Sequence, residues 1–421
     1  MRIEILCTGD EILTGKTINS NYSHIARRLE EVGLSAYWGT TVGDDRDSLL
    51  AAFRQAAARA DAVIVNGGLG PTVDDLSQEI AARAAGVELV LDEAWLARME
   101  EFYARRNRVM PPNNRKQAML PAGAEFIDNP IGTACGFAVT IDNVRFFFTP
   151  GVPREMRRML DEQIIPRLLA LGGVTGVTRL KRFHSFGIGE SRADQMLSDI
   201  LAPGADIKLG FQAHYPQLET KLAVRGIDGA DLERKLAPIE AEVRRRLGNF
   251  ILAEDDQTLE GVILSMLRDR GLSLSIAEMF TSGTIATRIA PLPGAESVFR
   301  RSAVARDLAQ LRAAVGLATG GDAGAVSPQA AAAVASMLRD SSGSSLALAV
   351  LVDLDEGADR MELGGTIAVG IADGGVAVAR QARLFGGRDW IRLGATELAL
   401  DCLRRHLLGL PVDEQIDFER R

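Results

Sequence analysis

The segment Gly67–Asp75, which reads GGLGPTVDD, carries the residue types best suited to chemistry in this sequence. Glycines at the end of a strand leave backbone N–H groups free to turn toward an anion. Two adjacent aspartates then offer the hard oxygen ligands that hold a divalent cation between two phosphates. The candidate residues of this segment are Gly67, Gly68, Gly70, Thr72, Asp74 and Asp75. A glycine-rich turn with a purely structural role is the alternative.

Three other polar loops are expected at the same edge of a sheet, because open α/β sheets bind ligands at the carboxyl ends of their strands. They read TGDEILTGKTINSN (8–21), VGDD (42–45) and NPIGTA (129–134). Together with the glycine turn they contribute the acids Asp10, Glu11, Asp44, Asp45, Asp74 and Asp75. A buried cluster of carboxylates is costly unless a cation neutralises it. For Asp45 and Asp75 the alternative is a role as helix caps or first-turn acids.

Amide donors and positive charge suited to a phosphate or a nucleobase edge come from the segment NNRKQ (113–117). Asn114 and Lys116 are the candidates there, and Gly132 and Thr133 of the NPIGTA loop are two further candidates for binding the ligand. We expect these residues to meet the glycine turn.

The elements that must position these residues alternate between strand and helix over the first ~170 residues, which is the pattern of a parallel sheet covered by helices. The β-branched run 61–66 predicts a strand buried on both faces. Helical spacing occurs over 21–32, 46–60, 76–85 and 92–107. We therefore expect a three-layer, mostly parallel α/β domain over residues 1–172.

Beyond this domain the pattern changes. Residues 173–253 predict a small α+β connecting domain, with strands over 178–186, 207–213 and 218–226. The acidic stretch 254–257 is interpreted as a linker, and residues 257–415 as a second α/β domain. The final residues IDFERR are expected to fray.

Composition narrows the function classes. The chain of 421 residues has a net charge of −8, which argues against nucleic acid as a partner because a phosphate backbone requires a clustered basic face. Its three cysteines and four histidines lack the spacing of a zinc site. No stretch has the length of a membrane span or the form of a signal peptide. We expect a cytoplasmic protein with no membrane partner.

The motifs carry a family resemblance. GDEILTGKTINSN, VGDD, GGLGPTVDDLSQE, NNRKQA, NPIGTACG and PGVPREM occur in order, and with FGIGES they resemble the CinA (competence/damage-inducible protein) family. The N-terminal domain of that family is similar to the molybdopterin-binding fold of the MogA and MoeA proteins. The resemblance implies metal-dependent hydrolysis of the pyrophosphate in ADP-ribose-type nucleotides, and a homodimer.

Carried over to this sequence, the resemblance implies a role for each candidate residue. Asp44, Asp74 and Asp75 would be catalytic, and Asp10, Glu11 and Asp75 would hold the metal. The implied cofactor is Mg²⁺ or a transition metal such as Co²⁺ or Mn²⁺, with K⁺ as a further candidate. The partner would be a nucleotide diphosphate. Which carboxylate acts as the base is left open.

The C-terminal part resembles the nicotinamide mononucleotide amidohydrolase domain of the same family through GAVSPQAAAAVA (324–335), GGTIAVGIA (364–372) and FGGRDWIRLGA (385–395). Its active-site motif A-E-S-C-T-G-G reads AEMFTSG here, so Met279 stands where the resemblance places the nucleophile. Arg306 and Leu311 occupy the positions of its basic partner segment, and the acidic run 352–360 replaces a glycine-rich loop. A thioether cannot form an acyl-enzyme.

We therefore expect that deamidation is lost, with Thr281 or Ser282 as the only candidates to replace the nucleophile. The leading interpretation is a nucleotide pyrophosphatase. The alternatives are a module that binds molybdopterin or a nucleotide without turnover, and an oligomeric scaffold.

Overall fold

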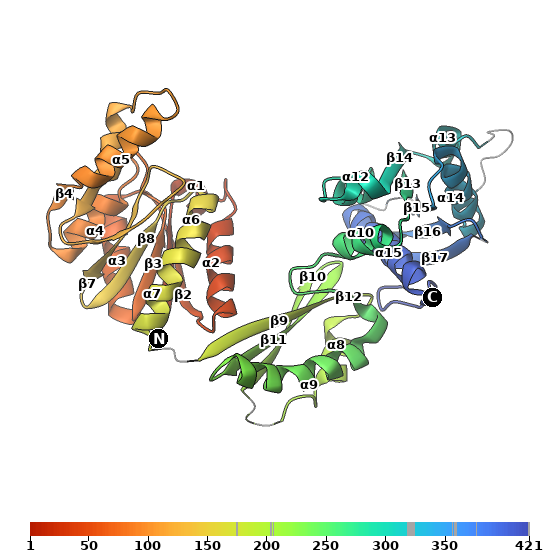
Figure 1. Cartoon of the computed structure of the whole chain (residues 1–421), viewed down its shortest axis with the longest axis horizontal. Coiled ribbons are helices and arrows are strands. Elements are labelled where there is room, and N and C mark those ends of the chain that lie inside the picture. Colours follow the sequence, from red (N-terminus) through yellow and green to blue (C-terminus); the bar gives the residue numbers. More distant parts are fainter. Residues whose placement is uncertain are drawn as a thin grey trace. The chain divides into compact units, whose positions relative to one another are not determined.

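The computed structural model describes residues 1–173, 176–202, 204, 206–317, 325–355, 357, 360–375 and 377–419 (Figure 1). Three motif-level expectations extend outside these residues: position 324 of the GAVSPQ motif, positions 356, 358 and 359 of the acidic run, and positions 420 and 421 of the IDFERR tail. The chain divides into two compact units, one formed by Met1–Leu180 with Arg225–Leu232 and the other by Lys181–Val224 with Glu233–Arg421.

The first unit is built on a six-stranded sheet of order β2-β1-β3-β8-β7-β6. Its strands are β1 (Ile3–Thr8), β2 (Ala36–Val42), β3 (Ala62–Asn66), β6 (Glu125–Ile127), β7 (Gly136–Ile141) and β8 (Val144–Thr149). The first four in spatial order are parallel, and β7 and β6 are added antiparallel. All five residues of β3 are buried, as expected for a central strand covered on both faces.

Helices cover both faces of this sheet (Figure 1). The helical elements are α1 (Asp10–Leu13), α2 (Ser20–Glu31), α3 (Arg46–Arg59), α4 (Ser77–Ala85), α5 (Glu93–Ala104), η1 (Pro112–Ala118), α6 (Pro153–Met159), η2 (Leu160–Ile164) and α7 (Ile165–Leu171). One hydrophobic core joins the sheet to α3, α4 and α5, and another joins it to α2, α6 and α7. A two-stranded ribbon of β4 (Leu89–Leu91) and β5 (Met119–Pro121) completes the unit. The predicted three-layer α/β fold is confirmed.

The register of the parallel strands brings their carboxyl ends to one edge. Thr8 pairs with Val42, Cys7 pairs with Asn66, and Asn66 pairs with Thr149. Four chain segments therefore leave the sheet side by side, and each continues into one of the polar loops or turns. This is the position at which open α/β sheets bind ligands.

The second unit contains two sheets. A four-stranded sheet of order β10-β11-β9-β12 is formed by β9 (Val177–Phe186), β10 (Ile207–His214), β11 (Gln217–Gly226) and β12 (Ile251–Glu254), with helices α8 (Glu190–Leu197), α9 (Gly229–Leu247) and η3 (Gly248–Phe250). A five-stranded sheet of order β14-β13-β15-β16-β17 is formed by β13 (Leu274–Met279), β14 (Phe299–Ala305), β15 (Leu346–Leu354), β16 (Gly364–Ala372) and β17 (Val378–Phe385).

Two cores hold the five-stranded sheet, one on each face. The first includes residues of α10 (Leu259–Asp269), α11 (Thr284–Ile289), α12 (Ala295–Val298) and α15 (Gly387–Leu408). The second includes residues of α13 (Leu308–Val315) and α14 (Pro328–Ser342). The first core also contains Phe186, Leu252 and Ala253 of the four-stranded sheet, so the two sheets share apolar packing.

One sequence interpretation is wrong. The C-terminal segment does not fray at Ile416–Phe418, because Ile416 is buried and Asp417 accepts a 2.9 Å bond from Gly189 N. A partner distant in the sequence therefore holds this terminal segment. The acidic stretch 254–257 begins at the last residue of β12 and carries ion pairs, since Lys181 Nζ lies 2.6 Å from Glu254 and 2.7 Å from Asp255.

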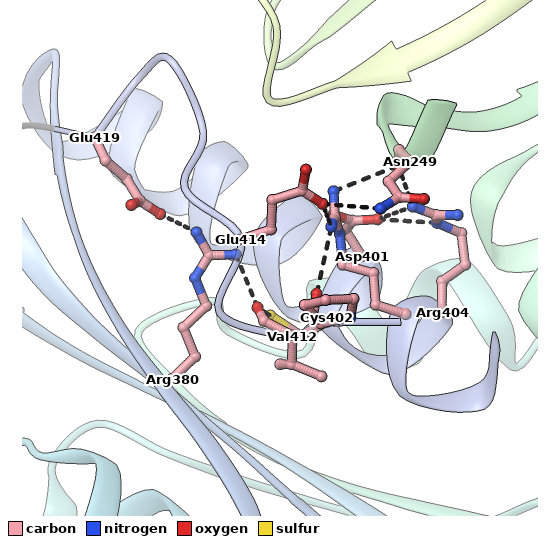
Figure 2. A network of polar contacts seen from close by, with 10 residues as sticks. Asn249, Arg380, Asp401, Cys402, Arg404, Val412, Glu414 and Glu419 are labelled. Carbon is pink, nitrogen blue, oxygen red and sulfur yellow. Dashed lines mark hydrogen bonds and ion pairs between the residues drawn. The ribbon is translucent and has the colours of Figure 1, made fainter. Parts of the chain in front are cut away.

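A buried ionic network closes the end of α15 (Figure 2). Asp401 is fully buried and accepts bonds of 2.9 and 2.7 Å from Arg404 and one of 2.7 Å from Arg405. Arg405 also pairs with Glu414, which accepts a bond from Asn249. Burial of these charges is tolerated because each finds an opposite charge or a carbonyl.

Candidate functional site

A cleft of about 580 Å³ opens at the carboxyl ends of the parallel strands of the first unit. Its lining comes from all of the polar loops expected there, and from the turn that follows β8. The volume lies in the range of sites that hold nucleotide-sized ligands. The sequence-predicted residues that line it are Glu11, Asp44, Gly67, Gly68, Gly70, Thr72, Asp74, Asp75 and Thr133.

The glycine turn forms one wall of the cleft, and close packing explains its composition. Gly67 and Gly68 have φ values of 110° and 70°, which side chains rarely adopt. A Cβ atom at Gly67 would lie 2.6 Å from Thr8 Oγ1, and one at Gly68 would overlap Ser77 Oγ. Ser77 in turn donates a 2.9 Å bond to the Gly67 carbonyl at the start of α4.

Asp75 holds the glycine turn itself. Its Oδ2 accepts bonds of 2.8 Å from Thr72 N and 2.5 Å from Thr72 Oγ1. A Cβ atom at Gly70 would overlap the same carboxylate. Lys116 is bound to this turn from outside the cleft, because its Nζ donates to the Thr72 carbonyl at 2.5 Å. Asp75 and Thr72 therefore fix the shape of the turn.

Glu11, Asp44 and Asp74 line the cleft and are called the acidic wall below. Asp44 is the member of this wall with the clearest contacts. Asp44 Oδ2 accepts a 3.1 Å bond from Asp10 N, and Asp10 Oδ1 accepts a 3.2 Å bond from Asp44 N. The pKa of Asp44 is raised, chiefly because the carboxyl is partly buried. The negative charges of Asp10, Glu11 and Asp74 also raise this pKa, and the hydrogen bond from Asp10 N opposes them only in part. The negative charges of three further acids thus act on the Asp44 carboxylate.

The acidic side chains of the cleft offer carboxylate oxygens to whatever binds there. Across the described residues no group of three or more acidic, histidine or cysteine side chains is arranged to hold a metal ion by itself. Mg²⁺ is usually bound by one or two carboxylates together with substrate phosphates and water. Asp44 and Asp74 face the cleft with oxygen donors of this kind, and Asp10 braces Asp44 from behind.

The amides of Asn21 and Asn66 line the cleft next to the glycine turn. Asn66 Nδ2 donates to Thr149 Oγ1 at 3.0 Å and to the Pro150 carbonyl at 2.8 Å. Asn21 Nδ2 donates to Asn66 Oδ1 at 2.9 Å and to the Gly151 carbonyl at 2.7 Å. These bonds fix both amides and hold the turn after β8 against α2.

Glu155 also lines the cleft and lies in the first turn of α6. Its Oε2 accepts a 2.8 Å bond from Asn129 Nδ2, while Asn129 Oδ1 accepts bonds from the backbone N–H groups of Ile131 and Gly132. A Cβ atom at Gly132 would overlap the Glu155 carboxylate. Burial raises the pKa of Glu155, and the bond from Asn129 only partly opposes that shift.

Five of the candidate residues do not line the cleft, namely Asp10, Asp45, Asn114, Lys116 and Gly132. Asn114 is buried and donates to Tyr103 Oη at 2.9 Å and to Gln117 Oε1 at 3.0 Å, so it anchors η1 to α5. Lys116 points to the outer side of the turn, and Gly132 lies behind Thr133 as the partner of Asn129. Asp45 caps α3 by accepting a bond from Ser48 N, as its alternative role predicted.

Sequence reasoning missed Asn66 and Glu155 as cleft residues, and it named Asn21 and Gln117 only as members of the segments 8–21 and 113–117. A signal was present for Asn66, since it ends a buried strand. Glu155 gave none, because a glutamate one turn into a helix is ordinary. Only the approach of the 129–134 loop to α6 reveals its position.

In the second unit, Met279 ends β13 where a strand-to-helix turn begins. Its side chain is buried in the core that contains Leu311, and Arg306 is exposed. Thr281 is fully buried and donates a 2.8 Å bond to Glu278 Oε2. Ser282 donates a 3.0 Å bond to the Phe280 carbonyl. Both hydroxyl groups thus serve the turn.

Glu278 explains why this turn keeps its shape. The carboxylate is fully buried and accepts bonds of 3.2 Å from Ile285 N and 3.0 Å from Ala286 N, which are the free donors at the start of α11. Phe280 and Ser282 have positive φ values of 75° and 58°. A strained backbone is therefore held by a buried cap.

Three family models match consecutive parts of the chain. They are described as a probable molybdopterin binding domain (residues 4–170), the damage-inducible protein CinA KH domain (180–253) and the CinA C-terminal domain (256–407). In the described residues, no helix combines the length and apolar character that crossing a membrane requires.

Relatives match over almost the whole chain. A CinA-like protein of Geotalea uraniireducens is 36% identical over 99% of this chain and 100% of its own length, and one of Shewanella sediminis is 39% identical over 97% and 96%. The crystal structure of the protein CinA with unknown function from Thermoplasma acidophilum is 34% identical over 39% of this chain and 96% of that chain, with a TM-score of 0.37. From its motifs, its three domain matches and these full-length relatives, the chain belongs to the CinA family.

Proposed function

We propose that the cleft of the first unit binds a nucleotide diphosphate and hydrolyses its pyrophosphate with the help of a divalent cation. The observation that carries this proposal is that one cleft is lined both by the glycine turn and by a group of carboxylates around Asp44. Diphosphates need both, because the backbone N–H groups bind the anion and the acids bring the cation.

Each wall has a defined part in this reaction. The glycine turn would orient the diphosphate, and Ser77 keeps that turn in place. The N–H groups of Gly67, Thr72 and Ser77 already donate within the protein, so other N–H groups of the turn would have to bind the anion. Asp44 and Asp74 would hold the cation, which when bound supplies Lewis-acid polarisation of the phosphoryl oxygens. Asp44 prefers its protonated form more than an ordinary aspartate does, so a cation or a bound water that donates to it stabilises its charged form.

The test is product analysis with ADP-ribose and either Mg²⁺, Mn²⁺ or Co²⁺, measuring AMP and ribose 5-phosphate. We expect Asp44→Asn to lower kcat/KM by about 100-fold or more. Asp45→Asn is the matched control, because Asp45 caps α3 outside the cleft and asparagine is an equally good cap. Equal activity in these two variants would refute the assignment of Asp44, and no AMP from the wild type with any of the metals would refute the function.

A second candidate is binding without turnover, with molybdopterin or a nucleotide as the ligand. It is favoured by the position of Asp75, whose carboxylate is committed to Thr72 and shapes the turn. A module of this kind would raise the unfolding temperature of the first unit with ligand while releasing no product.

For the second unit we propose that amide hydrolysis is lost. Met279 occupies the end of β13 as a core residue, and the Thr281 hydroxyl is committed to Glu278. Incubation of the full chain with nicotinamide mononucleotide is the test, and ammonia release above the uncatalysed rate would contradict the proposal.

A further inference from the structure

Two large apolar side chains are exposed at the otherwise polar cleft of the first unit. Ile18, in the loop between α1 and α2, is 88% exposed, and Val152, which directly precedes α6, is 51% exposed. Both residues line the cleft. A single apolar side chain on a surface is ordinary, but two that line one cleft lose their contact with water together when a ligand enters it.

Packing and a hydrogen bond connect both residues to the glycine turn. A Cβ atom at Gly151 would lie 3.8 Å from Gly67 Cα, so the residue before Val152 packs on the turn. Asn21 Nδ2 donates to the Gly151 carbonyl at 2.7 Å, and Ile18 precedes Asn21 in the same loop-to-helix segment. Three residues of chain span at most about 11 Å. Ile18 and Val152 therefore belong to two neighbouring segments, both beside the turn.

Exposed aliphatic side chains select an apolar part of the ligand. In a nucleotide diphosphate the phosphates and the ribose are strongly hydrated, and the nucleobase alone presents a flat, weakly hydrated face. Contact between such a face and an exposed isoleucine is favourable, because both surfaces lose water. The residues lining the cleft in the described part of the chain include no aromatic side chain, so aliphatic side chains are what a base can pack on there.

We propose that Ile18 and Val152 form a subsite for the face of the nucleobase, which makes the cleft selective for nucleoside diphosphates over diphosphates that carry no base. The proposal rests on the proposed function, because it takes the phosphates of the ligand to be seated on the glycine turn. Ile18 is the residue that determines specificity in this subsite: it contacts the base and takes no part in attack on phosphorus.

The experiment measures the affinities of ADP and of inorganic pyrophosphate by titration calorimetry with Mg²⁺, using the full chain of the wild type and of Ile18→Ser. Pyrophosphate contains the diphosphate and lacks the base, so it reports on the seat of the phosphates alone. We expect Ile18→Ser to weaken the binding of ADP about 3- to 10-fold and to leave the binding of pyrophosphate unchanged. Because the Ile18 side chain is almost fully exposed, the substitution should leave the fold intact.

A second substitution at the same position should have the opposite effect. Ile18→Phe offers the base a larger flat surface, so we expect ADP to bind about 3- to 10-fold more tightly, with the affinity for pyrophosphate again unchanged. Val109→Ser is the matched control. Val109 lies in the loop after α5, outside the lining of the cleft, and its aliphatic side chain is 93% exposed.

The outcomes separate the subsite from the proposed function. If the wild type binds both ligands and Ile18→Ser binds ADP as tightly as Val109→Ser does, the subsite is refuted while the proposed function stands. An equal loss of affinity for ADP and pyrophosphate in Ile18→Ser also refutes it, because the change would then act on the seat of the phosphates. If neither ligand binds to the wild type, the proposed function itself is refuted. A loss with serine and a gain with phenylalanine, both confined to ADP, would support the subsite.

Discussion

Asp401→Asn should be among the most destabilising single changes in the second unit. The substitution keeps the side-chain shape but removes the negative charge that Arg404 and Arg405 share, and both guanidinium groups are at most 4% exposed (Figure 2). Removing one partner of a buried ion pair costs about 3–5 kcal/mol, because the remaining charge is left uncompensated. Glu414 still pairs with Arg405, so we expect a loss of about 3 kcal/mol.

The same helix provides a matched control. Asp389 also faces an arginine three residues later, Arg392, but the pair is 3.8 Å apart and the Asp389 side chain is 86% exposed. Asp389→Asn should cost less than about 1 kcal/mol, since exposed pairs and first-turn acids contribute little.

The assay is urea unfolding followed by tryptophan fluorescence. The chain has three tryptophans, of which Trp390 alone belongs to the second unit. Replacing Trp38 and Trp95 with phenylalanine therefore leaves a signal that reports only on that unit. If the free energies of unfolding of Asp401→Asn and Asp389→Asn agree within about 0.5 kcal/mol, the reasoning about buried charge is refuted.

Three other outcomes are expected. Arg244 and Lys181 hold the pKa of Glu254 at about 2, below its ordinary 4.5. The ionised Glu254 carboxylate therefore stabilises the folded state above pH 4.5, and this stabilisation is lost as the pH falls toward 2. Urea unfolding of wild type and Glu254→Gln should show a difference in unfolding free energy of about 1 kcal/mol at pH 6 that shrinks by pH 3. Ser282→Gly should stabilise the second unit by about 0.5–1 kcal/mol in the same assay, because it relieves a φ of 58°, whereas Ser282→Ala should not. Met279→Ser should leave nicotinamide mononucleotide intact in an ammonia-release assay and lower the thermal unfolding midpoint, because it places a hydroxyl in a core.

Local sequence was sufficient for much of the fold. The β-branched run 61–66 contains the strand β3, which is buried on both faces. Asp45 caps α3, and the glycines at 67 and 68 adopt the positive φ that their lack of a side chain permits. These features depend on a few neighbouring residues, and the order of strands and helices follows from hydrophobic periodicity in the same way.

The direction in which polar side chains point was decided by tertiary structure. Asn114 and Lys116 have the chemistry of a phosphate site, yet one binds Tyr103 and the other binds the outer side of the glycine turn. Glu155 is brought into the cleft only because the 129–134 loop packs on α6. Sequence gives a side chain its donors and acceptors, but partners tens of residues away determine which of them are used.

The same division holds for the chain as a whole. The sequence by itself determined the α/β class, the glycine turn and the carboxylates that follow the strands, because these depend on spacing along the chain. Only the folded chain decided that Asp44 stands among three other acids while Asp75 braces its own loop, and that the C-terminal segment is held at Asp417. The physical reason is that burial and charge act over distances in space, and the sequence does not specify those distances locally.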